Sequence, residues 1–226
     1  EFDQMLFYLP LAGSTFKKVY YDELMDRAVS KFVPAEDLVV NYMASDLDSC
    51  ERITHIINMS YNDFRKKQVS GFYKDVEIMP SESSPSEVKK KYDEMEGIKP
   101  SYMDKSIKLY EFHVSLDLEG FEDKGMDGEP TGIKIPYIVT IEDSSSKIVG
   151  IRRNYDKGDE KKLKKRYFVH YKFLPGLGFY GLGLIHLIGA LSRAATQMLR
   201  QLIDAGTLAN LPAGFKSRGL KIRDDA

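Results

Sequence analysis

The alternation of apolar and polar residues predicts strands in the first sixty residues. The apolar run 5–9 ends at Pro10 and at a turn near Gly13, and further apolar stretches are rich in β-branched and aromatic residues. Those stretches cover residues 16–20, 27–33, 37–40 and 52–59. We therefore expect a β meander over residues 4–41 and one more strand before the first helix.

Two short helices are predicted next. Ser60 can cap the first helix, Asp63 lies near its positive end, and Gly71 can end it. The stretch 80–85 is rich in Ser, Pro and Glu, which indicates a linker. A short, highly charged helix is expected from Ser86 to about Glu96.

Strands return after residue 106. Residues 108–116 alternate well between apolar and polar side chains. Residues 133–141 and 147–152 are typical of a hairpin that turns at 143–145. The stretch 167–171 is expected to close this β region.

The last segment differs in kind, because residues 174–191 carry no side chain that is formally charged at pH 7. A membrane span must therefore be considered. Pro175 and five glycines disfavour a helix in the first half of the segment, and Arg193 and Arg200 occupy its clearly helical continuation. We expect an amphipathic helix over about 182–205 and no membrane span.

This helix has two contrasting faces when its residues are placed 100° apart. The apolar face consists of Leu184, Leu187, Ile188, Leu191, Ala195, Met198, Leu199 and Leu202. The opposite face carries His186, Arg193, Gln197, Arg200 and Asp204. The histidine and the two arginines are seven residues apart and form a nearly straight stripe. One face needs a partner surface, and the other suits water or a polyanion.

The composition excludes several classes of protein. With 226 residues, 42% hydrophobic residues and a formal net charge of −1, the chain is neither disordered nor a strongly basic nucleic-acid binder. Cys50 is the only cysteine, which excludes an internal disulfide and a paired-cysteine metal site. The opening residues Glu1-Phe2-Asp3 show no secretion signal, and we expect a piece of a longer protein.

The small net charge conceals two segregated regions. Residues 111–129 contain seven acids and one lysine, a net charge of −6. Residues 147–166 contain nine basic residues and three acids, a net charge of +6. These regions are either two solvated loops or two edges that meet between subunits of an oligomer. Our candidates for such an interface are Glu119, Glu122, Asp123, Lys161, Lys162, Lys164 and Lys165, together with Leu184, Leu187, Ile188, Leu191, Met198 and Leu202.

The sequence gives no sign of catalysis. A calcium loop that starts at Asp123 fails, because Lys134 stands where a glutamate ligand is required. The glycine pattern at 176–181 lacks a following βαβ unit and is interpreted as a chance match. The four histidines, His55, His113, His170 and His186, lie on separate elements without ligand spacing. Of these, His113 and His170 lie within strands and are expected to be structural. We expect no catalytic residue, metal or cofactor.

The order and the amino-acid sequences of several segments nevertheless resemble those of a known family. They are 32–40 (FVPAEDLVV), 52–55 (RITH), 110–120 (YEFHVSLDLEG), 171–176 (YKFLPG), 179–186 (FYGLGLIH) and 200–206 (RQLIDAG). Over most of its length, the chain is similar to the middle of the portal proteins of tailed bacteriophages. These proteins form the ring at one vertex of the capsid.

The resemblance implies an α+β fold with a β-rich wing portion, a mixed clip module and a long amphipathic stem helix. It places a partial wing at 1–80, a linker and a short charged stem arm at 81–100, and the clip at 101–173. A glycine-rich turn and the stem helix follow at 174–205. Residues 206–226 would return towards the wing and the tunnel loop.

The resemblance also implies a function. The chain would be a structural subunit of a ring of commonly twelve copies, located in the virion and made in the host cytoplasm. Double-stranded DNA would pass through the ring, and the terminase large subunit, the head–tail adaptor and the capsid protein would bind it. His186, Arg193, Gln197 and Arg200 are the candidates for the channel wall, although the stripe suits salt bridges between subunits equally well. The alternative is a non-viral α+β scaffold module that binds a protein.

Overall fold

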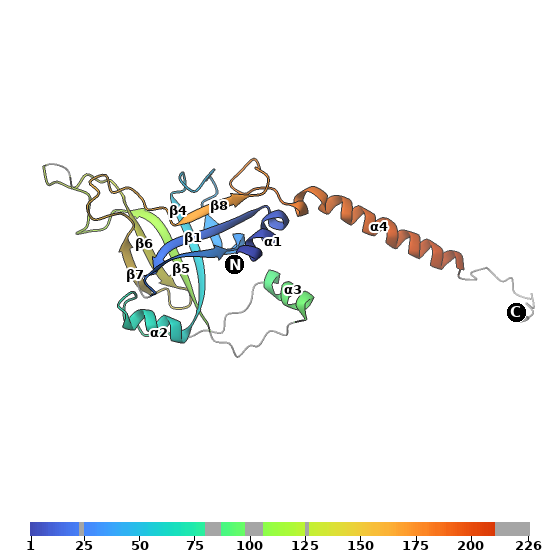
Figure 1. Cartoon of the computed structure of the whole chain (residues 1–226), viewed down its shortest axis with the longest axis horizontal. Helices are drawn as coiled ribbons and strands as arrows, with labels where there is room; N and C mark the ends of the chain where they lie inside the picture. Colours follow the sequence, from blue (N-terminus) through green and yellow to red (C-terminus); the bar gives the residue numbers. More distant parts are fainter. Residues whose placement is uncertain (23–24, 80–86, 98–105, 125–126, 211–226) are drawn as a thin grey trace, which may run out of the picture.

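The computed structural model describes residues 1–22, 25–79, 87–97, 106–124 and 127–210. It shows an α+β protein in which two antiparallel sheets form a body and one long helix extends away from it (Figure 1). The smaller sheet has the strand order β2-β1-β8, and the larger sheet has the order β3-β4-β5-β6-β7. The predicted fold class is therefore confirmed.

The smaller sheet is built from segments at both ends of the β region. Its strands are β1 (Ser14–Asp22), β2 (Arg27–Val33) and β8 (Phe168–Lys172). In the pairing of β1 with β8, Phe16 lies opposite His170. The expectation that residues 167–171 close the β region of the central strands is thus wrong. Tertiary packing places this strand beside β1 instead.

The larger sheet also crosses the expected segment boundary. Its strands are β3 (Leu38–Val40), β4 (Arg52–Ser60), β5 (Ser106–Leu116), β6 (Ile135–Glu142) and β7 (Ile148–Arg153). β4 pairs with β5 over nine residue pairs, including Ile53 with His113. Segments 1–80 and 101–173 therefore share both sheets.

The hairpin predicted between residues 133 and 152 is confirmed, and its turn has a clear cause. The carboxylate of Glu142 accepts hydrogen bonds from the backbone N–H groups of Ser144 and Ser145 and from both hydroxyl groups. Burial alone would raise the pKa of Glu142, but these hydrogen bonds outweigh it and hold the pKa below its usual value. The charged form of Glu142 therefore closes the turn.

The helices agree with the sequence except at the N-terminus. The predicted helix after Ser60 is α2 (Tyr61–Val69), and the Ser60 hydroxyl accepts a hydrogen bond from the backbone N–H of Asp63. The predicted charged helix is α3 (Glu87–Glu96). A 3-10 turn, Ala35–Asp37, precedes β3. The linker expected at 80–85 lies outside the described residues.

The apolar run 5–9 is not a strand but part of a helix, α1 (Phe2–Ala12). Pro10 lies inside α1, where it cannot donate a helical hydrogen bond, and Gly13 ends the helix in the left-handed conformation, with φ at 85°. Met5 is buried and α1 packs against β1, so tertiary contacts outweigh the β propensity of the run.

Three apolar clusters stabilise the body. The largest lies where the two sheets face each other and consists of Phe16, Val33, Leu38, Ala44, Cys50, Ile53, Phe168 and Phe179. A second cluster lies under α2 and contains Phe64, Tyr73, Ile78, Ile107, Leu109 and Val149. The third joins Ile135, Tyr137 and Val139 on β6. The lone Cys50 is thus a buried core residue.

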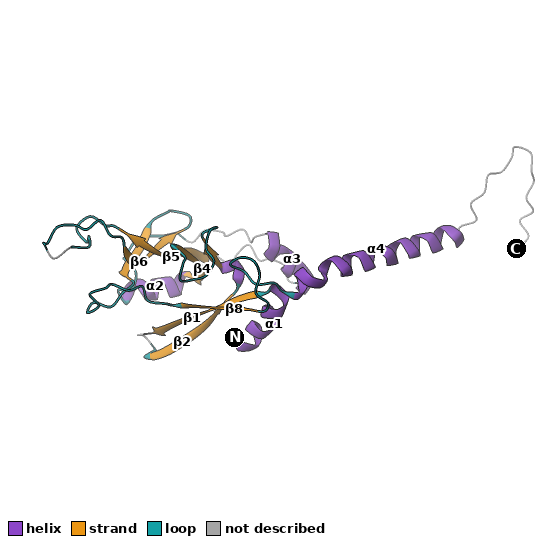
Figure 2. Ribbon diagram, turned by 90° about the horizontal axis from the view of Figure 1, so that it is seen from above, coloured by secondary structure: helices purple, strands orange, loops and turns teal. Residues whose placement is uncertain are grey.

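The final helix, α4 (Leu184–Asn210), projects from the body, as both views show (Figures 1 and 2). Its 27 residues correspond to a length of roughly 40 Å. The predicted helix is confirmed, but it continues five residues past Ala205. Residues 206–210 therefore belong to α4 and not to a return segment, and residues 211–226 lie outside the described residues.

Candidate functional site

The most conspicuous feature of the surface is the apolar face of α4. No residue of this helix is buried. Leu191, Met198 and Leu202, at the centre of the face, are between 68% and 72% exposed. An apolar stripe of this length is normally packed against another surface. Within the part of the chain that the structure describes, α1 contacts α4, but the large apolar side chains of this face remain at least 40% exposed.

The opposite face of α4 is polar and equally accessible. Arg193, Gln197 and Arg200 are all exposed, and neither arginine forms an ion pair with another described residue. The guanidinium groups therefore extend into solvent from one side of the helix. Such groups attract phosphate without reading base sequence.

His186 has a partner within its own turn. Its Nδ1 accepts a hydrogen bond of 3.1 Å from the backbone N–H of Gly183, the residue that precedes α4. This is the geometry of a capping box, in which a side chain in the first turn reaches back to the first free N–H group. A role as helix cap thus accounts for His186 without any contact to DNA.

The charged loops lie at the end of the body opposite to α4 (Figure 1). Lys162 of the basic region forms an ion pair with Asp123 of the acidic region within one chain. Lys165 is 2.5 Å from Asp156, and the Lys164 ammonium donates to the carbonyl oxygen of Cys50 at 3.3 Å. Part of the opposite charge is therefore neutralised without a second subunit.

The other interface candidates remain accessible. Glu119 and Lys161 are exposed, whereas Glu122 is half-buried and its carboxylate accepts a hydrogen bond from the backbone N–H of Gly120. The described structure pairs neither Glu119 nor the Lys161 ammonium with an opposite charge. These two side chains are thus the ones best placed to contact another molecule.

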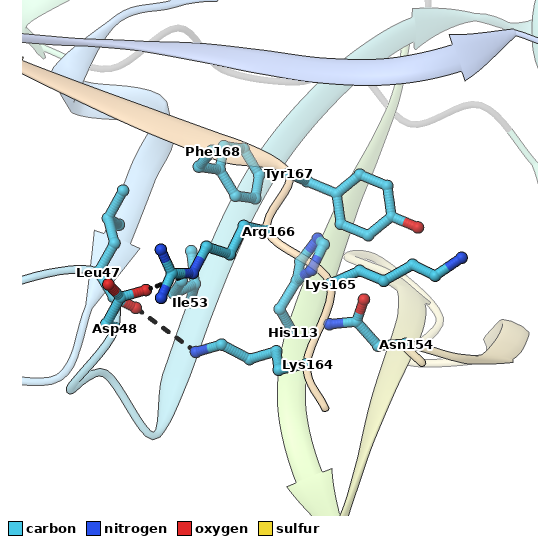
Figure 3. A pocket seen from close by; sticks show the side chains of 10 residues that line it. All are labelled: Leu47, Asp48, Ile53, His113, Asn154, Lys164, Lys165, Arg166, Tyr167 and Phe168. Carbon is cyan, nitrogen blue, oxygen red and sulfur yellow. Dashed lines mark hydrogen bonds and ion pairs between the residues drawn. The ribbon is translucent and has the colours of Figure 1, made fainter. Parts of the chain in front are cut away.

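A small pocket lies between the basic region and the core (Figure 3). Its volume of about 20 Å³ holds one water molecule and is too small for a nucleotide or an organic cofactor. Asn154 is 1% exposed, and neither the nitrogen nor the oxygen of its side-chain amide has a hydrogen-bond partner among the described residues. Arg166, at the pocket rim, is paired with Asp48 at 3.0 Å.

A buried group of charged and polar side chains joins the two sheets. Glu111 on β5 is 4% exposed and accepts from the Nζ atom of Lys18 on β1 at 2.5 Å and from Nε2 of His113 at 2.8 Å. Burial lowers the pKa of His55 to about 3, with a further contribution from the charge on Lys18. This group has the contacts of a structural tie between sheets, and a structural role was expected for its member His113.

The described part of the chain contains no group of three or more His, Cys, Asp or Glu residues placed to hold a metal ion. None of its described helices combines the length and the hydrophobicity that a bilayer span requires.

Comparison with known proteins adds no assignment. No protein-family model matches the sequence, and no curated protein is significantly similar to it.

Sequence reasoning missed the residues that hold the elements together. Lys18 and Glu111 were not singled out, although Glu111 occupies an inward position of an alternating strand between Leu109 and His113. A carboxylate at such a position signals a buried partner. The turn expected near Gly13 is present, but no local pattern indicates that Gly13 and Ser14 contact residues 181–183.

Proposed function

We propose that this chain is a structural subunit of a phage portal ring. Copies of the chain would assemble around a channel through which double-stranded DNA enters and leaves the capsid. The proposal rests on the segments that resemble portal proteins and on one structural observation, the bare apolar face of α4. It requires no catalytic residue or cofactor of the chain itself.

The apolar face of α4 supports assembly through a simple argument. An isolated helix in water is marginally stable, and most helices are stabilised by packing of an apolar face. This face contains at least seven large apolar side chains, each at least 40% exposed: Leu184, Leu187, Ile188, Leu191, Met198, Leu199 and Leu202. Packing of α4 against α4 of neighbouring copies buries this face and leaves the polar face free.

The polar face would then line the channel. DNA must slide through a portal, so the wall needs weak attraction for phosphate at many positions and tight contact at none. Arg193 and Arg200 lie about 10 Å apart along the helix axis, as expected for seven residues. Two widely spaced positive charges per subunit fit this requirement.

The far end of the body would bind the packaging machinery. The acidic and basic loops lie there, and Glu119 and Lys161 are exposed on them. Charged rims set the specificity and the rate of protein association more than its strength. We assign this end to contact with the terminase large subunit and the head–tail adaptor, at the portal vertex of the virion.

Native mass spectrometry together with electron microscopy tests the proposal. Twelve copies of the 25.8 kDa chain give a closed ring of about 310 kDa. Leu191→Asp with Leu202→Asp places two carboxylates in the apolar face and should leave monomers. Thr196→Asp, on the polar side of the same helix, is the matched control and should leave the ring intact.

The outcomes separate the two candidate functions. A closed ring that is lost only in the apolar-face variant supports the portal subunit. A chain that stays monomeric at every concentration, in its full natural length, argues instead for the α+β scaffold module that binds a protein partner.

A further inference from the structure

Three glycines meet where α4 leaves the body. Gly13 ends α1, whereas Gly181 and Gly183 lie directly before α4. A Cβ atom built on Gly13 would lie 2.5 Å from the carbonyl oxygen of Gly181. One on Gly181 would lie 2.5 Å from the carbonyl oxygen of Gly13, and one on Gly183 would lie 2.6 Å from the backbone nitrogen of Gly13.

These contacts involve only backbone atoms. A clash with a flexible side chain can be relieved by a rotation, but a clash with backbone requires one chain segment to move. Gly13 also has a φ of +85°, which other residues adopt only with strain. Glycine is therefore required at Gly13 and at two positions, Gly181 and Gly183, that lie about 170 residues further along the sequence.

Hydrogen bonds hold the two segments at this distance. The backbone N–H of Phe173 donates to the carbonyl oxygen of Gly13 at 3.0 Å, and the N–H of Gly181 donates to the hydroxyl oxygen of Ser14 at 2.7 Å. Ser14 is 2% exposed, and its hydroxyl oxygen also lies 3.1 Å from Nε2 of His170. The loop before α4 is thus tied to α1, β1 and β8 together.

The direction of α4 follows from the same contacts. The carbonyl oxygen of Gly183 accepts the backbone N–H of His186 at 3.0 Å, while the Gly183 N–H donates to the His186 side chain. Gly183 therefore begins the helix, and its backbone is in close contact with the backbone of Gly13. A rotation of α4 about its base would break these contacts.

We propose that Gly13, Ser14, Gly181 and Gly183 form a rigid joint that fixes the direction in which α4 leaves the three-stranded sheet. The joint gives Gly181, the last glycine of the 176–181 pattern, a role in packing against Gly13. The inference goes beyond the proposed function, because it concerns contacts within one chain and holds whether or not a ring forms. In a ring, the joint would set the tilt of every α4 helix.

Pulsed electron spin resonance tests the joint. Nitroxide labels at Ser30 on β2 and Thr207 on α4, both exposed, report the distance between sheet and helix in a Cys50→Ala background. Dilution of labelled chains with an excess of unlabelled chains restricts the signal to distances within one chain. The unaltered joint should give one narrow distance distribution.

Gly181→Ala and Gly183→Ala should broaden or shift that distribution, because the added methyl group forces the segments apart. Gly178→Ala and Gly206→Ala are matched controls, since a Cβ atom at either position meets nothing within 4 Å. The controls should reproduce the narrow distribution. A joint variant with the same distribution as the controls would overturn the proposal.

Circular dichroism establishes that each variant is folded. If the alanine variants do not fold, Ser14→Ala decides the question, because it removes the acceptor of the Gly181 N–H without adding bulk. It should broaden the distribution with the body still folded, and an unchanged width for Ser14→Ala would refute the joint.

Discussion

The ammonium group of Lys18 lies 2.5 Å from a carboxylate oxygen of Glu111, and this buried ion pair ties the smaller sheet to the larger one. Burial alone would raise the pKa of Glu111. The hydrogen bond from His113 and the charge on Lys18 together outweigh burial and hold the pKa well below its usual range. The carboxylate is therefore charged at neutral pH and depends on both partners.

We expect Lys18→Met to lower the free energy of unfolding by about 3–5 kcal/mol, because the buried carboxylate loses its nearest cation and keeps only Arg152, which lies 4.0 Å from its other oxygen. Urea unfolding at pH 7 measures this loss. Lys31→Met is the control, since Lys31 pairs with Lys18 across β1 and β2 but is exposed; its effect should stay within about 0.5 kcal/mol. Equal losses in the two variants would contradict a special role for Lys18.

Two histidines inside the body, the buried His55 and the half-buried His170, are expected to make the fold less stable in acid. Burial lowers the pKa of His55 to about 3 and that of His170 to about 4, the latter with help from the charge on Lys172. Between pH 6.5 and 4 the unfolded chain therefore binds protons that the folded chain does not, so the free energy of unfolding falls as the pH falls.

His170→Gln tests this dependence, because glutamine offers a hydrogen-bond acceptor but does not titrate. Between pH 7 and pH 4.5, the free energy of unfolding of the variant should fall by about 1–2 kcal/mol less than that of the wild type. This expected difference is reduced for solvent screening, because His170 is only half-buried. Urea midpoints at the two pH values give the comparison. A variant that loses as much as the wild type would show that His170 is not the source.

Arg193→Glu with Arg200→Glu should leave the mass of the assembly unchanged and impair DNA packaging or ejection. Both side chains are exposed on the polar face, where carboxylates would repel phosphate. Arg193→Lys with Arg200→Lys keeps the charge and should package normally. Nuclease-protected DNA in assembled particles is the readout. Dissociation of the ring in the glutamate variant would instead place the arginines in salt bridges between subunits.

Charge reversal of Lys161, Lys162, Lys164 and Lys165 should weaken assembly, but the structure separates their roles. Lys162 pairs with Asp123 in the same chain, so Lys162→Glu should loosen the loop and lower the thermal stability of the monomer. Lys161→Glu changes only an exposed charge and should weaken assembly without that loss. An unchanged oligomer mass in the fourfold variant would remove the charged loops from the subunit interface.

Local patterns predicted much of the secondary structure. Ser60 and Asp63 located the start of α2, and the amphipathic period located α4 to within five residues of its end. The apolar run at 5–9 failed, because a five-residue run fits a strand or a buried helix equally well. Its helical form depends on packing against β1 and α4, which no short window contains.

The sequence by itself determined the α+β class, the two faces of α4 and the segregation of charge. Each of these depends on residues close together in the chain. Only the tertiary structure decided that β8 joins β1, that Lys18 neutralises Glu111, that Lys162 meets Asp123, and that Gly13 touches Gly181 and Gly183. Those contacts join residues 39 to about 170 positions apart, and their energies come from burial and backbone fit, which exist only after the chain has folded.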